Sequence, residues 1–413
     1  MRRRVVVTGL GAVTPVGNDV ATTWQALLAG KSGAADITRF DAAKYSVRFA
    51  CEVKQFDPLA YMDRKEAKRA DVYAQFAVAA SLQAVADAGI APGSIAPETM
   101  GVIIGSGIGG IRSFEDQHDV YRTLGPSKIS PFFIPMFIGD IAAGIVSMRL
   151  NAKGPNYATV SACASSAHAI GDAFRIIQYG DAEVMVAGGS EAAVTPMSIG
   201  GFANMGALST RNESPETASR PFDAGRDGFV MGEGSGVVVL EELEHAKRRG
   251  ARIYGEVIGY RATGDAYHLT GQPDAHEGLQ RAMRGAMKDA GIAPTDVQYI
   301  NAHGTSTPLN DPNESKGIKA VFGDHAHVLS VSSTKSATGH MLGAAGSVEF
   351  IACTLAIRDN TIPPTINYST PDPECDLDYT PNTPRQRTVD VAMSNSSGFG
   401  GHNVSIALRR WHE

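Results

Sequence analysis

The apolar positions of this 413-residue chain follow two alternating patterns. Short, nearly continuous runs such as Val5–Val7 and Val102–Ile104 end at glycines or polar turns, which is typical of buried strands. Longer stretches such as Ala164–Gly180 instead repeat apolar residues at helical spacing. Because strands and amphipathic helices alternate, the pattern predicts an α/β fold in which helices cover parallel sheets.

One six-residue segment occurs twice, since Asp87–Pro92 is repeated as Asp289–Pro294, 202 positions later. Each copy ends an alanine-rich helical stretch, and each is soon followed by an apolar strand and a turn. A weaker echo links the strand ends Val160–Ser161 and Val331–Ser332. The repeat predicts two related halves that stack into a layered α/β/α/β/α body.

The halves are predicted to be residues 1–254 and 255–413. The first half is longer, and its surplus near 108–140 is predicted to be an insertion that lies over the entrance to a site. In such a body the site lies where strand ends and helix starts from both halves converge.

Charge and composition exclude several classes. A formal net charge of -6 argues against a general nucleic-acid partner. The apolar stretch Phe132–Met148 carries Asp140, and the N-terminal valine run is too short for a signal peptide, so neither a membrane span nor a leader is predicted. The cysteines are scattered without a framework spacing, which favours a reducing cytoplasm.

Cys163 lies between a predicted strand, Asn156–Ser161, and the helix predicted over Ala164–Gly180. A thiol at a helix N-terminus feels the positive end of the helix dipole and free backbone N–H groups, which lower its pKa. The position therefore indicates a nucleophile. A buried structural cysteine is the alternative that remains open at this point.

Two segments of the second half carry histidines. A polar turn after an apolar strand presents His303 with three hydroxyls, and a segment rich in small residues contains Lys335 and His340 and opens a helix that carries Glu349. Both patterns suit catalysis. Taken singly, the first fits a hydrogen-bonded turn equally well, and the second is more typical of a tight helix contact with a satisfied core histidine.

A fourth segment, Asn395–Asn403, has glycines on both sides of Phe399, which could act as a gate or simply fill the core at a hairpin turn. The run Gly105–Gly110 formally satisfies the G-x-G-x-x-G pattern of dinucleotide-binding proteins. The segment after it does not form a clean amphipathic helix pattern, so an NAD(P)-dependent oxidoreductase is the weaker interpretation.

Together and in this order, the segments around Cys163, His303, His340 and Phe399 resemble the beta-ketoacyl-acyl carrier protein synthases. The likeness is strongest to the elongating, long-acyl type II subtype. It runs from Val5–Gly11 to the final strand, through Arg220–Asp223 and Gly232–Gly234. It implies a thiolase-like, five-layered α/β/α/β/α fold built from duplicated halves, and a homodimer.

The resemblance also implies roles for individual residues. Cys163 becomes the acyl acceptor, His303 and His340 act on the malonyl thioester, and Phe399 is the gate. The ion partners of the histidines would be Lys335 and Glu349. The backbone N–H groups of Cys163 and Phe399 would form an oxyanion hole. The hydroxyls that line the carrier's pantetheine arm would be those of Thr305 and Thr307.

The resemblance also implies one set of residues that lines the acyl pocket and another that binds the carrier protein. The acyl pocket is predicted to be lined by Ile108, Phe133, Ile138 and Phe202, and its depth also depends on side chains across the dimer interface. An acidic acyl carrier protein would bind a basic patch of Lys65, Lys68, Arg69 and Lys128, although such clusters are often only solvated helix faces. The reaction would need no metal or redox cofactor, and a bound cation near Asn301 and Asn395 is left open.

The resemblance implies that the chain extends an acyl group on Cys163 by two carbons, by decarboxylative condensation with malonyl carrier protein in fatty acid biosynthesis. A polyketide-type ketosynthase, or a chain-length partner on the same fold, is the alternative. Such partners usually lack the cysteine. Ser165 and Ser166 depart from the Thr and then Gly or Ser of many members, which leaves the shape of the acyl pocket less certain.

Overall fold

The computed structural model describes residues 2–412, and its centre is a ten-stranded mixed sheet. From one edge to the other the strands are β5 (Asn156–Tyr157), β4 (Met100–Gly105), β6 (Val184–Glu191), β7 (Gly234–Glu242), β1 (Val5–Val13), β8 (Gly255–Gly264), β14 (His402–Arg409), β13 (Val391–Gly398), β9 (Tyr299–Asn301) and β10 (Ser330–Ser332). The two halves of this sheet meet where Val5–Val7 of β1 pairs with Gly255–Val257 of β8.

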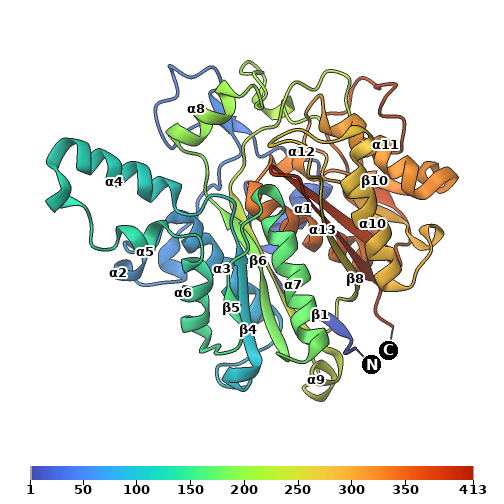
Figure 1. The fold of residues 1–413 in the computed structure, drawn as a ribbon, viewed down its shortest axis with the longest axis horizontal. Coiled ribbons are helices and arrows are strands. Elements are labelled where there is room, and N and C mark those ends of the chain that lie inside the picture. The colour runs from blue at the N-terminus through green and yellow to red at the C-terminus, as the bar shows by residue number, and fades with distance from the viewer. Residues whose placement is uncertain (1, 413) are drawn as a thin grey trace.

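Helices pack on and between the two halves of the sheet (Figure 1). They are α1 (Val20–Leu28), α2 (Arg64–Ala67), α3 (Val72–Asp87), α4 (Ile111–Leu124), α5 (Phe133–Phe137), α6 (Ile141–Leu150), α7 (Ser165–Tyr179), α8 (Pro196–Asn204), α9 (Leu243–Arg248), α10 (Glu277–Ala290), α11 (Asn310–Phe322), α12 (Lys335–Thr338) and α13 (Ala345–Asp359).

Five layers result, and the burial of each helix follows its place in them. α3 packs on β1, β7 and β6, with α6 beside it, and α10 packs on β8 and β14, with α11 beside it. α7 and α13 lie between the half-sheets and contact strands of both. The inner helix α13 is buried from Ala345 to Ile357, whereas α10 buries one stripe that includes Leu279, Met283 and Met287.

The two halves repeat the same element order. Outward from the centre, β1-β7-β6-β4-β5 in one half corresponds to β8-β14-β13-β9-β10 in the other. Asp87–Pro92 and Asp289–Pro294 close the equivalent helices α3 and α10. The five-layered, duplicated fold expected from the sequence is confirmed. The division at 254/255 stays a prediction, and β8 begins at Gly255.

Two local patterns were misread. The strand predicted over Asn156–Ser161 contains only Asn156–Tyr157, because the chain turns toward Cys163. The helix expected to carry Glu349 is present as α13, and the segment before it also contains the short helix α12, which ends before Gly339 at φ 65 and Leu342 at φ 45. A 14-residue helix, α4, does follow Gly105–Gly110. Its sequence lacks the apolar stripe of a packed helix because only Ser113 is buried.

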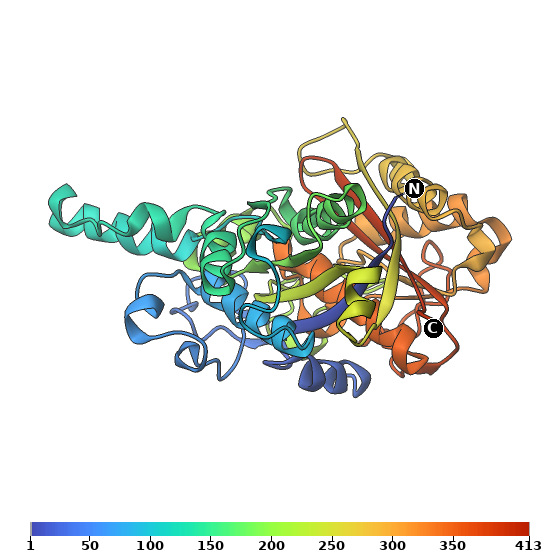
Figure 2. The same ribbon diagram turned by 90° about the horizontal axis from the view of Figure 1, so that it is seen from below.

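The predicted insertion near 108–140 forms an arm. α4 projects from the body, and the chain returns along α5 to the neighbourhood of α2 (Figures 1 and 2). Rings of Phe114, Phe133 and Phe137 join α4 to α5. No helix within residues 2–412 is long and apolar enough to cross a membrane. All four cysteines are buried free thiols.

Candidate active site

Cys163 lies in a tight turn, Ala162–Ala164, that leads directly into α7. The turn needs a left-handed residue, and Ala162 supplies it with φ 50. Backbone N–H groups of Cys163 and Phe399 face the sulfur. Phe399 can approach because Gly398 has no side chain, since a Cβ there would lie 2.5 Å from the carbonyl of Ser161. Two converging N–H groups are suited to holding a negative oxygen.

Burial raises the pKa of the Cys163 thiol to about 12, with the nearby Lys335 and the two N–H groups acting in the opposite direction. The sequence predicted a lowered pKa from the helix N-terminus, and that prediction was wrong. Cys163 is 9% exposed, so a thiolate there loses most of its hydration, and this loss outweighs the opposing effects of Lys335 and the two N–H groups.

The rings of His303 and His340 meet edge to face, with their centroids 5.4 Å apart. Burial first, and then the positive charge of Lys335, lower the pKa of both well below the usual value, so both are neutral at pH 7. The Nδ1 atoms of both rings are buried, and no residue from 2 to 412 forms a hydrogen bond with them. Each neutral ring has one N–H donor, and together they can present two donors to one oxygen.

Glu314 fixes the backbone of the His303 turn. Its carboxylate accepts from the N–H groups of His303 and Gly304, both at 2.8 Å. On the other side, the N–H of His340 donates to the carbonyl of Val230 at 2.7 Å. The two histidines are thus held through their main chains, which leaves the rings free for a ligand.

Lys335 and Glu349 form a buried ion pair next to the histidines. Both side chains are 2% exposed. Glu349 Oε2 and both amide atoms of Asn301 are buried without a protein partner. Within residues 2–412 no three His, Cys, Asp or Glu side chains gather as a metal site.

A cavity of about 280 Å³ opens at these residues. Of the residues predicted from sequence, it is lined by Cys163, Phe202, His303, Thr305, Thr307, His340 and Phe399. The Thr305 and Thr307 hydroxyls are 3.0 Å apart. An aromatic group formed by Phe202 with Phe229 and Phe399 bounds the cavity.

Other predicted residues lie outside this cavity. Ile108 packs in the apolar cluster that contains Cys163, Phe202 and Leu342. Phe133 and Ile138 lie at α5 on the arm, so the single chain does not bring them to the site. The exposed basic residues predicted to bind the carrier are Lys65, Lys68 and Arg69 at α2 and Lys128 beyond α4. Arg69 stacks on Phe132 at 4.0 Å.

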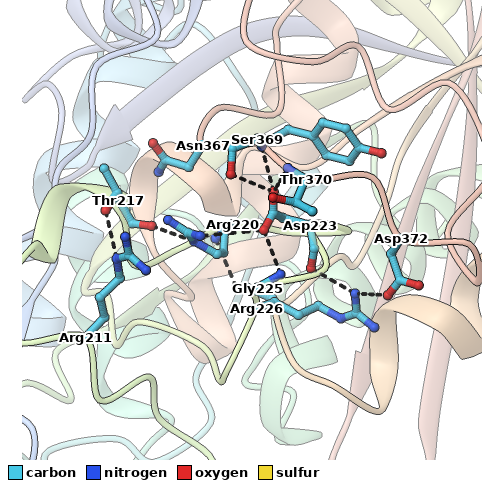
Figure 3. A network of polar contacts seen from close by, with 12 residues as sticks. Arg211, Thr217, Arg220, Asp223, Gly225, Arg226, Asn367, Ser369, Thr370 and Asp372 are labelled. Carbon is cyan, nitrogen blue, oxygen red and sulfur yellow. Dashed lines mark hydrogen bonds and ion pairs between the residues drawn. The ribbon is translucent and has the colours of Figure 1, made fainter.

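A second network, missed from the sequence, supports the Ser306–Thr307 turn. Figure 3 shows Asp223 and Arg226 in contact with the segment that contains Ser369, Thr370 and Asp372, and Arg220 beside Asp223. Arg226 donates to the carbonyl of Thr307 at 3.1 Å and to Asp372 at 2.6 Å. The N–H of Arg220 donates to the Ser306 hydroxyl at 3.0 Å.

Asp311 completes that support. It accepts from the N–H groups of Thr305 and Ser306, both at 3.1 Å. Asp311 and Glu314 stand one helical turn apart directly after the predicted turn, and this acidic pair was the signal that could have identified them. Arg226 offered no comparable pattern.

The Gly105–Gly110 turn is occupied from within the protein. The N–H groups of Gly107 and Ile108 donate to the carboxylate of Glu191 at 2.7 and 3.1 Å. A dinucleotide pyrophosphate would need such donors. Because a buried carboxylate already uses them, the structure argues against the oxidoreductase interpretation.

Sequence comparison identifies two consecutive domains in the chain. Residues 2–246 match the beta-ketoacyl synthase N-terminal domain, and residues 254–369 match the C-terminal domain. The chain is 54% identical over 410 residues to 3-oxoacyl-[acyl-carrier-protein] synthase 2 of Synechocystis, and 55% identical over 409 residues to that of Coxiella burnetii. Each alignment covers 99% of both proteins.

Two solved structures of ketosynthases superpose closely on this chain. A type II PKS ketosynthase in complex with its acyl-carrier protein superposes with a TM-score of 0.92 at 38% identity, covering 100% of both chains. A beta-ketoacyl synthase from Burkholderia phymatum gives a TM-score of 0.93 at 36% identity, covering 99% of this chain and 100% of that one. Because the two family models together cover most of the chain and relatives that are 54 and 55% identical align over nearly its whole length, this chain belongs to the beta-ketoacyl synthase family.

Proposed function

We propose that this protein is a 3-oxoacyl-[acyl-carrier-protein] synthase that lengthens an acyl chain by two carbons. The observation that carries the proposal is the convergence of Cys163, His303 and His340 on one cavity. Relatives named 3-oxoacyl-[acyl-carrier-protein] synthase 2 match the chain over nearly its full length. The division into residues 1–254 and 255–413 then places the cysteine in one half and the histidines in the other.

In the first half-reaction, Cys163 sulfur attacks the thioester carbonyl of an acyl carrier protein. The N–H groups of Cys163 and Phe399 stabilise the oxyanion of the tetrahedral intermediate. The carrier thiol leaves with the proton that the cysteine gives up. An acyl-enzyme thioester results, which divides a difficult condensation into two easier steps.

In the second half-reaction, malonyl carrier protein enters along Thr305 and Thr307. Loss of carbon dioxide leaves an enolate, whose oxygen accepts N–H donors from His303 and His340. Burial, together with the positive charge of Lys335, keeps both rings neutral. The enolate carbon attacks the acyl thioester, and the bond between the acyl carbon and the Cys163 sulfur breaks. The sulfur leaves as a thiolate that takes up a proton from solvent, and the 3-oxoacyl carrier protein is released after Phe399 moves aside.

We further propose a homodimer through the arm and β5. Half of the large, exposed hydrophobic side chains fall on one segment: Phe114, Tyr121, Leu124, Ile134, Ile138, Met148, Tyr157 and Val160. Strand β5 is also a sheet edge. Patches of this kind mark interfaces, and a partner on this face would cover them. Phe133 and Ile138 could then reach the partner's acyl pocket.

Lys65, Lys68, Arg69 and Lys128 are proposed to receive the acidic carrier protein. Their side chains are exposed, and the charges of Lys65, Lys68 and Lys128 are not engaged by carboxylates of the described residues. Attraction between a basic patch and an acidic partner speeds encounter without requiring a basic protein overall. A cytoplasmic location, where thiols stay reduced, fits the four free cysteines.

A polyketide ketosynthase is the second candidate, because a type II PKS ketosynthase shares this fold. Identity favours fatty acid synthesis, at 53 to 55% for the synthase 2 relatives against 38% for that structure. A chain-length partner without its own chemistry would not need Cys163 in a strained turn.

The test is product formation from purified components. With hexadecanoyl and malonyl carrier proteins, the wild type is expected to form the 3-oxo product two carbons longer, and Cys163→Ala is expected to form none. Cys353→Ala is the matched control, since Cys353 is also buried but lies outside the cavity. Absence of the longer product with the wild type would overturn the proposal.

A further inference from the structure

The turn that carries Cys163 has a counterpart in the second half of the chain. Ala162–Ala164 leads into the 15-residue helix α7, and Leu342–Ala344 leads into the 15-residue helix α13. Both turns begin with a non-glycine residue in the left-handed region, Ala162 at φ 50 and Leu342 at φ 45. Gly343 follows Leu342 just as Cys163 follows Ala162, so Gly343 is the residue of the second turn that corresponds to Cys163.

This second turn is closed by the carboxylate of Glu191. The N–H of Gly343 donates to Glu191 Oε2 at 2.9 Å, as does that of Gly107 at 2.7 Å. Oε1 accepts from the Ser106 hydroxyl at 3.0 Å and from the N–H of Ile108 at 3.1 Å. A side chain on Gly343 is excluded, because its Cβ would lie 2.4 Å from Gly107 N.

Glu191 is fully buried and forms no salt bridge with any described residue. Leaving such a group uncompensated would be costly. Here four donors surround its two oxygens. A carboxylate can accept hydrogen bonds at both oxygens, whereas a protonated acid carries an O–H donor on one of them. Burial raises the pKa of Glu191, and the four donors from two separate segments act against this rise and fix the position of the carboxyl group.

Those two segments bound the environment of the nucleophile. Ile108 and Leu342 pack in the same apolar cluster as Cys163 and Phe202. Glu191 bonds directly to the backbone of Ile108 and to that of Gly343, next to Leu342. One carboxylate thus sets the separation of two side chains that flank the cysteine.

We propose that Glu191 is a positioning residue that fixes Ile108 and Leu342 beside Cys163 and so sets the enzyme's preference for long acyl chains. The proposal rests on the acyl-enzyme chemistry proposed above. A short acyl group on Cys163 needs little of this space, whereas a long one must pass between the apolar side chains. Disturbing the carboxylate should therefore affect long chains selectively.

The test compares acylation by acetyl and hexadecanoyl carrier proteins in the wild type and in Glu191→Gln. Glutamine keeps the shape but turns an NH₂ group toward two donors, so two of the four bonds are lost. We expect kcat/KM for hexadecanoyl transfer to fall at least about tenfold more than that for acetyl transfer. An equal loss for both substrates would overturn the proposal.

Glu241→Gln is the matched control. Glu241 is also fully buried and forms an ion pair with Arg249. It lies opposite Val184 at one end of the β6–β7 pair, whereas Glu191 lies opposite Gly234 at the other end. Its substitution tests instability alone and should leave the ratio of the two rates unchanged. A shift in that ratio as large as in Glu191→Gln would contradict the assignment.

Ser106→Ala removes one of the four donors to Glu191. This variant replaces Glu191→Gln in the test if Glu191→Gln does not fold. It should shift the ratio in the same direction by a smaller factor, and no shift in this folded variant would also overturn the proposal. A wild type that forms no acyl-enzyme with either substrate would refute the proposed function instead. A wild type that acylates normally, with variants of unchanged preference, would refute only the role of Glu191.

Discussion

Almost every titratable side chain at the cavity is buried, and burial determines its protonation state. It raises the pKa of Cys163 and lowers the pKa of His303 and His340, so the resting site holds a thiol and two neutral imidazoles. A neutral imidazole can donate to an enolate oxygen without first losing a proton. The same neutrality means that the thiol proton must leave during acylation.

Alkylation of Cys163 by iodoacetamide tests this state. Because the pKa is raised to about 12, the thiolate fraction should grow about tenfold per pH unit from pH 7 to pH 10. The rate, followed by intact mass with Cys163→Ala as background, should rise throughout this range. A rate that levels off below pH 9 would show that the helix N-terminus outweighs burial.

The buried ion pair of Lys335 and Glu349 gives a second prediction at this scale. Glu349→Gln leaves a buried cation without its partner and should lower the free energy of unfolding by about 3–5 kcal/mol. The double variant Lys335→Met with Glu349→Leu should recover most of that loss in urea denaturation. If the double variant is as unstable as the single one, the pair does not act as a buried unit.

The residues that sequence located well are those with a distinctive chemical type in a local pattern. Cys163, His303 and His340 all line the cavity, as expected. Glu191 was missed because its donors come from residues 84 positions earlier and 152 positions later in the chain. Contacts of that range arise only when the two halves pack together, and no local pattern encodes them.

Among the elements, the hairpin between β13 and β14 is the most closely tied to its surroundings. Asn403 donates to Asp265 at 2.6 Å and lies 3.0 Å from His276 Nε2. Gly400 N donates to the carbonyl of Leu269 at 2.7 Å. Phe399, the proposed gate, therefore lies on a hairpin anchored to the loop before α10.

His276, at the start of α10, makes this anchor sensitive to pH. Burial lowers its pKa to about 4, so the unfolded chain binds a proton near pH 6.5 that the folded chain does not. This contribution to stability is present above pH 6.5 and is lost as the pH falls toward 4. Between pH 7.5 and 5 it amounts to about 2 kcal/mol.

His276→Gln should lose less stability than the wild type over that pH interval, by about the same 2 kcal/mol. Urea denaturation at pH 7.5 and pH 5 measures both proteins. The change in the free energy of unfolding between the two pH values is compared between the two proteins. Buried carboxylates affect this change in the opposite direction, but they do so equally in both proteins and therefore cancel. Equal losses in the two proteins would mean that His276 is not held neutral.

Element types were predictable where hydrophobic periodicity was strong, as for β1, β4 and α7. Boundaries failed where backbone geometry decided them. The turn at Gly339 and Leu342 interrupts a sequence of small residues that has no other sign of a break. α4 escaped detection for a different reason, since its apolar side chains face outward and do not repeat a buried stripe.

For the whole molecule, duplication explains why the site lies at its centre. Equivalent turns before α7 and α13 face each other between the half-sheets, one with Cys163 and the other with Gly343. One carries the proposed nucleophile, and in the other the N–H of Gly343 donates to the carboxylate of Glu191. The active site is thus built from one half's cysteine and the other half's histidines.

The exposed apolar face of the arm predicts an assembly of two chains. Light scattering should give twice the chain mass of 43.4 kDa for the wild type. Tyr157→Glu with Val160→Glu places charges on the proposed interface and should give the single-chain mass. Met197→Glu is the control, because Met197 is exposed outside this face. A monomeric wild type would contradict the proposed interface.

The most direct test of the central claim is the intact mass of the enzyme after mixing with hexadecanoyl carrier protein, followed by malonyl carrier protein. The account predicts a hexadecanoyl adduct on the wild type that peptide mapping places on Cys163, that is absent from Cys163→Ala, and that disappears as the 3-oxo product forms. An adduct on another residue, or none on any, would contradict it.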